Sequence, residues 1–160
     1  MKNKTVLNVI LFISIFALCS AYFIEYILGY KACNLCLIER LPYFSAIIII
    51  SLGLFLDRFE KFIFISLCLI FISATILSFY HFGIEQGLFK ESLVCVLNNE
   101  IDNLSKEDLL KEFQKTVISC KDVEFTLFGL SLATINVIIS FILSVITFKL
   151  FLNYEKNRSK

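Results

Sequence analysis

Charged residues are missing from four long stretches of this 160-residue chain. Asp, Glu, Lys and Arg are absent from Thr5–Ile24, Leu41–Leu56, Phe62–Ile84 and Phe125–Phe148. The chain is 58% apolar and contains 18 phenylalanines, whereas soluble domains are roughly 45–50% apolar. A helix needs about 17–25 mostly apolar residues to cross a bilayer. The missing charges therefore exclude a soluble globular domain and predict four membrane-spanning helices.

A cleavage signal is also missing. No small-x-small pattern closes the first apolar run, which is longer than the roughly 7–15 residues of a signal-peptide core, so we expect a retained helix. Internal repeats and low-complexity tracts are absent too. We therefore predict an all-α integral membrane protein with one domain over residues 1–160. The expected fold is a four-helix transmembrane bundle with spans at about 6–28, 37–56, 62–82 and 125–148, a short loop at about 29–36 and a long loop at about 83–124.

Lysine and arginine are slightly more numerous on the side of the chain termini. Eight of the 15 lie in the termini and around the turn at 57–61, and seven lie on the other face. The long loop also carries nine acidic residues. Because cytoplasmic loops are enriched in Lys and Arg, we expect both termini in the cytoplasm. The two other loops would then face an oxidising compartment, where disulfides persist.

The six cysteines form two groups. Cys19 and Cys68 lie deep in apolar windows and are expected to be inert, buried thiols. The other four gather on the outer face: Cys33, Cys36, Cys95 and Cys120. They could form two static disulfides, a zinc site or a redox relay. Structural zinc sites more often use two closely spaced cysteine pairs or histidines, so we expect no metal.

The spacing of the first pair favours redox chemistry. A C-x-x-C motif closes a small, reducible ring and commonly lowers a thiol pKa. A helix that begins near Cys36 would stabilise a thiolate there, and Arg40, one helical turn further on, adds a fixed positive charge. Pro42 marks an expected kink, which neighbouring helices can accommodate. In the long loop, Ser105 and Asp108 form an approximate capping box that predicts a short amphipathic helix.

Together these residues resemble a known family. The string C-x-x-C-x-x-x-E-R over Cys33–Arg40 leads into the second of four spans, and a cysteine pair lies between spans three and four. This pattern resembles the disulfide bond formation protein B (DsbB) family over nearly the whole chain. The resemblance implies a protein-disulfide oxidoreductase (thiol oxidase) of the bacterial inner membrane with periplasmic cysteine loops, because that system keeps the periplasm oxidising.

The resemblance implies a role for each outer cysteine. Cys95 matches the cysteine that forms a mixed disulfide with a DsbA-like thioredoxin-fold oxidase, and Cys120 is its partner. Cys33 and Cys36 match the pair beside a membrane quinone, ubiquinone or menaquinone, with Cys36 as the thiolate that contacts it. Arg40 matches the arginine that polarises a quinone oxygen. Electrons would pass from the oxidase through the loop pair and the C-x-x-C pair to quinone.

His81 is the only histidine, near the outer end of the third predicted span. Ionisable groups at membrane depth are functional suspects, so we expect it beside the quinone, as a hydrogen-bonding group or proton carrier. The alternative is that His81 has no role at the site and only extends its polar ring to the membrane–water interface. We expect Glu39 to orient Arg40, and Glu25 to be an interfacial residue.

Two other interpretations stay open. A non-catalytic four-span organiser of the tetraspanin type also carries cysteines between spans three and four, but its Cys-Cys-Gly string is absent here. Vitamin K epoxide reductase-like enzymes share the chemistry but carry their redox C-x-x-C at a later span. The expected partners are the DsbA-like oxidase and membrane lipid, with no nucleic acid.

Overall fold

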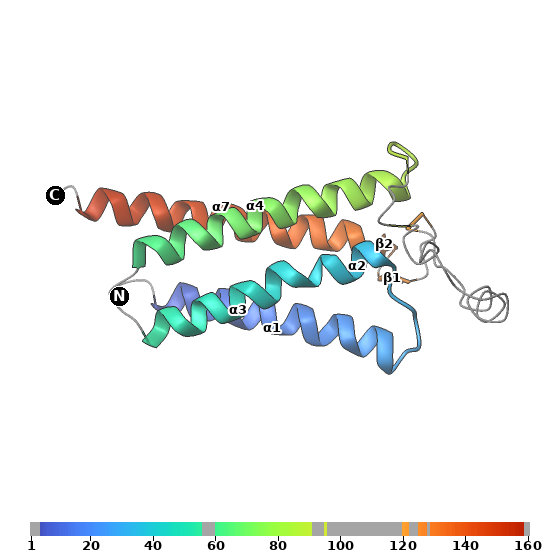
Figure 1. The fold of residues 1–160 in the computed structure, drawn as a ribbon, viewed down its shortest axis with the longest axis horizontal. Helices are drawn as coiled ribbons and strands as arrows, with labels where there is room; N and C mark the ends of the chain where they lie inside the picture. The colour runs from blue at the N-terminus through green and yellow to red at the C-terminus, as the bar shows by residue number, and fades with distance from the viewer. Residues whose placement is uncertain are drawn as a thin grey trace, which may run out of the picture.

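The bundle is elongated, with long helices side by side (Figure 1). The computed structural model describes residues 4–55, 60–90, 95, 120–121, 125–127 and 129–158. Its helices that are long and apolar enough to cross a membrane are Lys4–Tyr26, Asn34–Leu54, Glu60–Glu85 and Leu132–Lys156. These four spans confirm the predicted all-α membrane fold. The first helix begins, and the last ends, at the end of the bundle opposite α2 (Figure 1).

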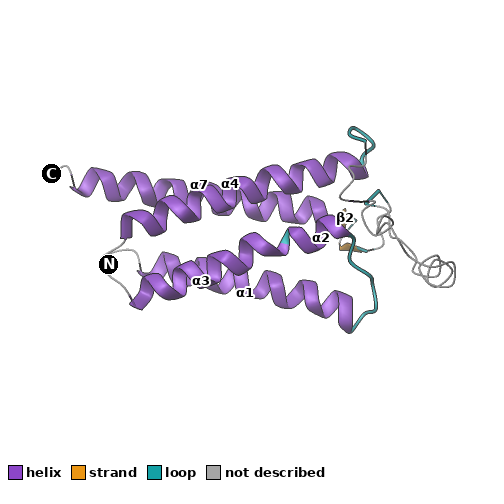
Figure 2. Cartoon of the chain, viewed as in Figure 1, coloured by secondary structure: helices purple, strands orange, loops and turns teal. Residues whose placement is uncertain are grey.

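The second span consists of two helices. The elements in chain order are α1 (Lys4–Tyr26), α2 (Asn34–Ile38), α3 (Arg40–Phe55), α4 (Glu60–Glu85), β1 (Thr126–Leu127), β2 (Leu130–Ser131) and α7 (Leu132–Arg158). Figure 2 shows the interruption between α2 and α3.

The interruption lies at Glu39 and follows from Pro42. Proline lacks the backbone N–H that would bond to the carbonyl of Ile38, and its ring crowds that carbonyl. Accordingly, α2 ends at Ile38, and the N–H of Glu39 closes its last turn on the carbonyl of Leu35 at 2.9 Å. The kink expected from Pro42 therefore lies three residues before it, at Glu39. Glu39 belongs to neither helix, so its side chain does not follow the face of α2 or of α3.

The last helix begins later than the span predicted at about 125–148. Residues Thr126–Leu127 and Leu130–Ser131 pair as antiparallel strands, and Gly129 has a φ of 81°, which favours glycine. Backbone N–H and C=O groups there are paired in this hairpin and not in a helix. Helix α7 follows from Leu132. Hydropathy alone does not separate an apolar hairpin from the start of an apolar helix. The amphipathic helix predicted from Ser105 lies outside the described residues.

α4 packs most extensively on α7, while α3 packs on both α1 and α4. A buried cluster fills the middle of the bundle: Leu7, Ile10, Tyr43, Ala46, Ile50, Ile63, Phe64, Leu67, Phe71, Leu143 and Leu150. Large apolar side chains also point outward, among them Phe12 and Phe62. Outward apolar side chains suit a bundle surrounded by lipid, where close packing between helices replaces the hydrophobic effect of water.

The outer end of α4 is covered by the chain that follows it. The N–H of Leu88 and of Phe89 both bond to the carbonyl of Gly83, at 2.8 and 3.1 Å. The Phe89 ring stacks on Tyr80, with centroids 5.7 Å apart. A Cβ at Gly83 would clash with Cδ2 of that ring, so any other residue here would have to displace the Phe89 side chain.

We predict that Gly83→Val lowers the thermal stability of the detergent-solubilised protein, because overpacking at such a contact costs roughly 1–3 kcal/mol. Adding Phe89→Ala removes the clashing ring and should recover most of the loss. Melting curves of the single and double variants, compared with Phe89→Ala alone, measure this coupling. A Gly83→Val protein as stable as the parent would contradict the packing described here.

Candidate thiol redox site

The outer cysteine pairs meet in one buried cluster at the outer end of the bundle. Cys95 and Cys120 form a disulfide with their Cα atoms 5.8 Å apart, whereas Cys33 and Cys36 are free thiols. Cys33, Cys95 and Cys120 are all buried, together with Leu35 and Ile84, and Cys36 packs against them. The structure therefore brings together two pairs that are about 60 residues apart in the sequence.

The two remaining cysteines differ from each other. Cys68 is buried in α4, as expected, but Cys19 is exposed on the surface of α1. The expectation of a buried Cys19 is therefore wrong. Its apolar window faces outward as well as inward, and lipid is as apolar as a protein core. Neither residue belongs to the outer cluster.

Cys33 caps the helix that carries Cys36. Its backbone is extended, with φ −69° and ψ 165°, and its sulfur accepts a hydrogen bond from the backbone N–H of Cys36 at 3.2 Å. The Cys33 sulfur thus takes the place that a serine or aspartate oxygen has at most helix starts. We expected the helix amides to serve Cys36, but α2 begins earlier, at Asn34, so the amide of Cys36 serves Cys33.

Hydrogen bonds lower the pKa of Cys33. The side chain of Cys36 is the largest cause, burial of the sulfur opposes it, and His81 adds a smaller lowering. Together they bring the pKa of Cys33 from 9.0 to about 5. The lowered pKa favours the thiolate of a reduced Cys33, the form that attacks disulfides.

His81 is buried and bonded on both sides of its ring. Its Nδ1 lies 2.8 Å from Oε1 of Glu39, and its Nε2 lies 3.6 Å from the sulfur of Cys33. The other carboxylate oxygen of Glu39 accepts a hydrogen bond from the amide of Asn136 in α7 at 2.7 Å. Glu39 therefore turns towards α4 and α7. The expectation that it orients Arg40 is wrong.

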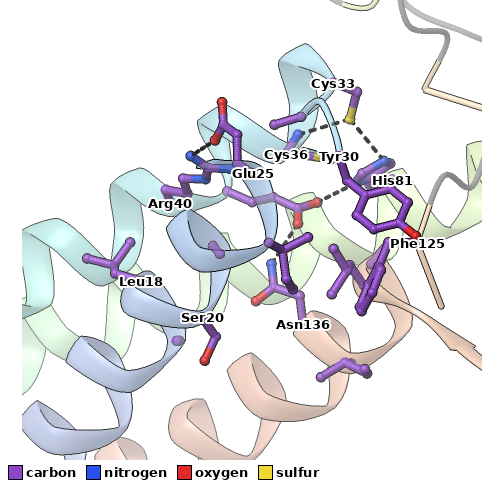
Figure 3. A pocket seen from close by; sticks show the side chains of 18 of the residues that line it. Leu18, Ser20, Glu25, Tyr30, Cys33, Cys36, Arg40, His81, Phe125 and Asn136 are labelled. Carbon is purple, nitrogen blue, oxygen red and sulfur yellow. Dashed lines mark hydrogen bonds and ion pairs between the residues drawn. The ribbon is translucent and has the colours of Figure 1, made fainter. Parts of the chain in front are cut away.

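Arg40 turns to the other side, towards α1. Its Nη1 lies 2.5 Å from Oε2 of Glu25, and its guanidinium lies 4.8 Å from the centre of the Tyr22 ring. Figure 3 shows this ion pair on one side of the cavity and the Cys33–His81 contact on the other. Glu25 is thus the counter-charge of Arg40, a role that its position in the sequence did not indicate.

A second carboxylate lies near His81. Oε1 of Glu85 is 3.9 Å from Nε2 of His81, and Oε2 of Glu85 accepts a hydrogen bond from the hydroxyl of Ser131 at 2.5 Å. Ser131 ends β2, so the hairpin that precedes α7 supplies this donor. Sequence reasoning missed both Ser131 and Asn136. The available signal was polarity, since Asn136 is the only asparagine in the charge-free stretch Phe125–Phe148.

A cavity of about 300 Å³ joins these groups. Its polar lining includes Cys33, Cys36, Arg40, His81 and Cys120, and its apolar lining comes from side chains of α1, α3 and α7. An apolar cavity with a few convergent polar groups is typical of a small-molecule site. The lining therefore suits a small, largely apolar molecule that has a few polar atoms.

The cavity lining also contains side chains of the kinds that bind metal ions. Within the part of the chain that the structure describes, one group brings metal-type donors together: the sulfurs of Cys33 and Cys36 and a ring nitrogen of His81, all within 4.8 Å of one another. A structural zinc site uses four such donors, whereas a catalytic one uses three with an open position. The expectation of no metal at this group therefore stays a prediction.

Comparison with known proteins identifies the family. The model of the family described as "Disulfide bond formation protein DsbB" matches residues 3–150 of this chain. The chain is also 34% identical over 155 residues to "Uncharacterized protein RP370" of Rickettsia prowazekii (strain Madrid E), covering 95% of this chain and 90% of that protein. No solved structure matches the chain. With its four apolar spans, the chain belongs to the DsbB family and is a multi-pass membrane protein of disulfide bond formation.

Proposed function

We propose that this protein reoxidises a DsbA-like, thioredoxin-fold dithiol oxidase of the periplasm and passes the electrons to membrane quinone. The observation that carries the proposal is the burial of Cys33, Cys95 and Cys120 in one cluster, beside a cavity that Cys36 also lines. Disulfide exchange needs sulfurs in direct contact, and this cluster supports exchange between the two pairs.

The proposed relay has four thiols with separate roles. A thiolate of the client attacks Cys95, the bond between Cys95 and Cys120 breaks, and Cys120 departs with the electron pair. Cys120 then attacks Cys33, and Cys36 departs in turn. The second thiol of the client then attacks the client sulfur bound to Cys95, and Cys95 departs. Cys95 attacks Cys120, and Cys33 departs. Each exchange forms one S–S bond and breaks another, so the client ends oxidised, the Cys95–Cys120 bond is restored, and Cys33 and Cys36 hold the two electrons. The low pKa of Cys33 supports rapid exchange there, because a low-pKa thiol also leaves readily.

The electron acceptor has to be stronger than the client. An oxidase of the DsbA type already has a potential of about −120 mV, so few acceptors can reoxidise it. Quinone, with which the family is generally associated, would supply a two-electron acceptor that dissolves in the membrane. The cavity supports this assignment because Arg40 offers N–H donors in a mostly apolar lining that also includes Cys36.

The orientation follows from the same proposal. A periplasmic client requires the cysteine-bearing end of the bundle to face the periplasm of a bacterial inner membrane and both termini to face the cytoplasm. The small excess of Lys and Arg on the side of the termini supports this orientation. A non-catalytic organiser of the tetraspanin type is less consistent with the chain, because it would need neither a cavity beside the thiols nor a C-x-x-C pair.

The first test is turnover by cysteine variants. Replacing any one of Cys33, Cys36, Cys95 or Cys120 by Ser should abolish quinone-dependent oxidation of a reduced DsbA-type oxidase, because each sulfur carries one exchange step. Cys19→Ser and Cys68→Ser are the matched controls and should keep full activity. The assay follows client thiols and quinone absorbance with purified protein in detergent. Full activity of Cys36→Ser would rule out the proposed relay.

The second test is the order of the relay. In Cys120→Ser, Cys95 can still attack an oxidised client, and the mixed disulfide cannot be resolved because no partner thiol attacks the Cys95 sulfur. A covalent complex should therefore accumulate on a non-reducing gel and vanish with reductant. The control is Cys95→Ser in the same background, which should remove the complex. Trapping that survives loss of Cys95 and requires Cys33 would reverse the order.

The third test concerns Arg40. Arg40→Ala should raise the apparent KM for quinone by roughly tenfold or more, since a hydrogen bond to a charged donor is worth about 1.5–3 kcal/mol. Arg40→Lys should recover part of the loss, because lysine keeps the charge without the planar fork. Trapping of the client at Cys95 is the control and should not change. An unchanged quinone dependence in Arg40→Ala would contradict this role.

A further inference from the structure

A chain of hydrogen bonds runs through the interior from α7 to the sulfur of Cys33. The amide of Asn136 donates to Oε2 of Glu39 at 2.7 Å, and Oε1 of Glu39 lies 2.8 Å from Nδ1 of His81. Nε2 of His81 lies 3.6 Å from the Cys33 sulfur. Glu39 is 7% exposed and His81 is 2% exposed. Bulk water therefore does not mediate these contacts.

The carboxylate decides which ring nitrogen of His81 carries the hydrogen. An ionised carboxylate only accepts hydrogen bonds, so Nδ1, which faces Glu39, has to be the donor. In a neutral imidazole, Nε2 is then the acceptor, and it faces the sulfur of Cys33. A sulfur nucleophile, an imidazole and an orienting carboxylate in this order form the arrangement that activates nucleophiles in many enzymes.

Asn136 fixes the carboxylate in turn. Its Nδ2 donates to Glu39 and also to the hydroxyl of Ser78 at 2.8 Å, while its Oδ1 accepts from the hydroxyl of Tyr43. The hydroxyl of Tyr43 donates its proton, so it pairs with the oxygen of the Asn136 amide and not with the nitrogen. The amide nitrogen is therefore held towards Glu39. Asn136 thereby joins α3, α4 and α7 at the depth of the carboxylate.

We propose that His81 is the acid–base partner of the Cys33 sulfur, and that Asn136 is a positioning residue that acts on His81 through Glu39. The proposal deepens the thiol oxidase function proposed above and rests on it. It gives His81 a role towards the thiol in addition to any role towards quinone.

The proton balance of this role is simple. When the thiol of Cys33 is activated, its proton moves to Nε2 of His81, which leaves a thiolate and an imidazolium beside the Glu39 carboxylate. In the last exchange of the relay, Cys95 attacks Cys120 in the mixed disulfide between Cys120 and Cys33. The Cys95–Cys120 bond forms, the bond to Cys33 breaks, and Cys33 departs with the electron pair. The imidazolium of His81 then returns the proton to Cys33.

Other titratable groups surround the pair and contribute to its pH dependence. Glu85 of α4 lies 3.9 Å from Nε2 of His81, and Cys36 of α2 donates its backbone N–H to the Cys33 sulfur. In the reduced protein Cys95 and Cys120 also titrate, in the same cluster as Cys33. The remaining titratable groups that line the cavity are Glu25, Tyr30, Lys31, Arg40 and Tyr43. The variants chosen below leave all of these groups in place except Tyr43, which is replaced in one of them.

The test measures the reactivity of Cys33 in the reduced full-length protein, without quinone and without client. Iodoacetamide alkylates thiolates, so the rate at Cys33, followed by peptide mass spectrometry across pH, has an inflection at the pKa of this thiol. His81→Asn should move the inflection upward by about one pH unit or more, which corresponds to roughly tenfold slower alkylation below both inflections. Asn136→Leu should move it in the same direction by less.

The double variant separates positioning from general damage. If Asn136 acts through His81, then His81→Asn with Asn136→Leu should have the same inflection as His81→Asn alone, because coupled residues are not additive. Thr147→Val is the matched control in α7, since its hydroxyl bonds only to carbonyls of its own helix. Its profile should equal that of the parent. Tyr43→Phe, which removes one anchor of Asn136, replaces Asn136→Leu if that variant does not fold.

An unchanged inflection in His81→Asn would overturn the proposal. A shifted inflection in His81→Asn with additive effects of Asn136→Leu would overturn the positioning role of Asn136. Both outcomes are independent of turnover. A protein that passes this test and still fails to oxidise the client with quinone would refute the proposed function and leave the acid–base role standing.

Discussion

The buried carboxylate of Glu39 is the constraint on which the outer half of the bundle depends. A charge at membrane depth is tolerated when partners satisfy it, and removing one partner of a buried charge costs about 3–5 kcal/mol. Both oxygens of Glu39 are occupied, one by His81 of α4 and one by Asn136 of α7. The break between α2 and α3 aims the carboxylate at both helices. Satisfying this single charge therefore sets the positions of three spans relative to the C-x-x-C motif.

The neighbouring position has the opposite charge and the opposite direction. Arg40 begins α3 and pairs with Glu25 of α1, while Glu39 pairs across to α4 and α7. Two adjacent residues thus send charges to opposite walls of one cavity, and the thiols of Cys33 and Cys36 line the space between them. The E-R dipeptide of the motif places a hydrogen-bond donor on one wall and an imidazole on the other, with a reactive sulfur beside both.

The sequence predicted the fold better than the site. Absent charges locate membrane spans, because burial of charge in lipid is costly. The cysteine spacing singled out the two pairs that the structure brings into one cluster. The hairpin Thr126–Ser131 was missed because an apolar strand and an apolar helix have the same hydropathy. The partner of Glu39 was assigned wrongly because adjacency suggested Arg40, whereas the helix break at Glu39 turns the two side chains in different directions. Asn136 was missed because its importance lies in contacts between helices that no local pattern encodes.

Under the proposed function, the burial of the loop disulfide would separate exchange with the client from exchange with the C-x-x-C pair. Cys95 is 3% exposed and Cys120 is 2% exposed, so a protein-sized client cannot bring a thiolate to either sulfur in this arrangement. The C-x-x-C pair, in contrast, is in the same cluster and needs no encounter from solution. This arrangement is therefore the one suited to exchange between the two pairs. In the proposed relay, attack by the client would require Cys95 to leave the cluster. Because thiolates attack any accessible disulfide, keeping both sulfurs covered between encounters protects the relay from small thiols.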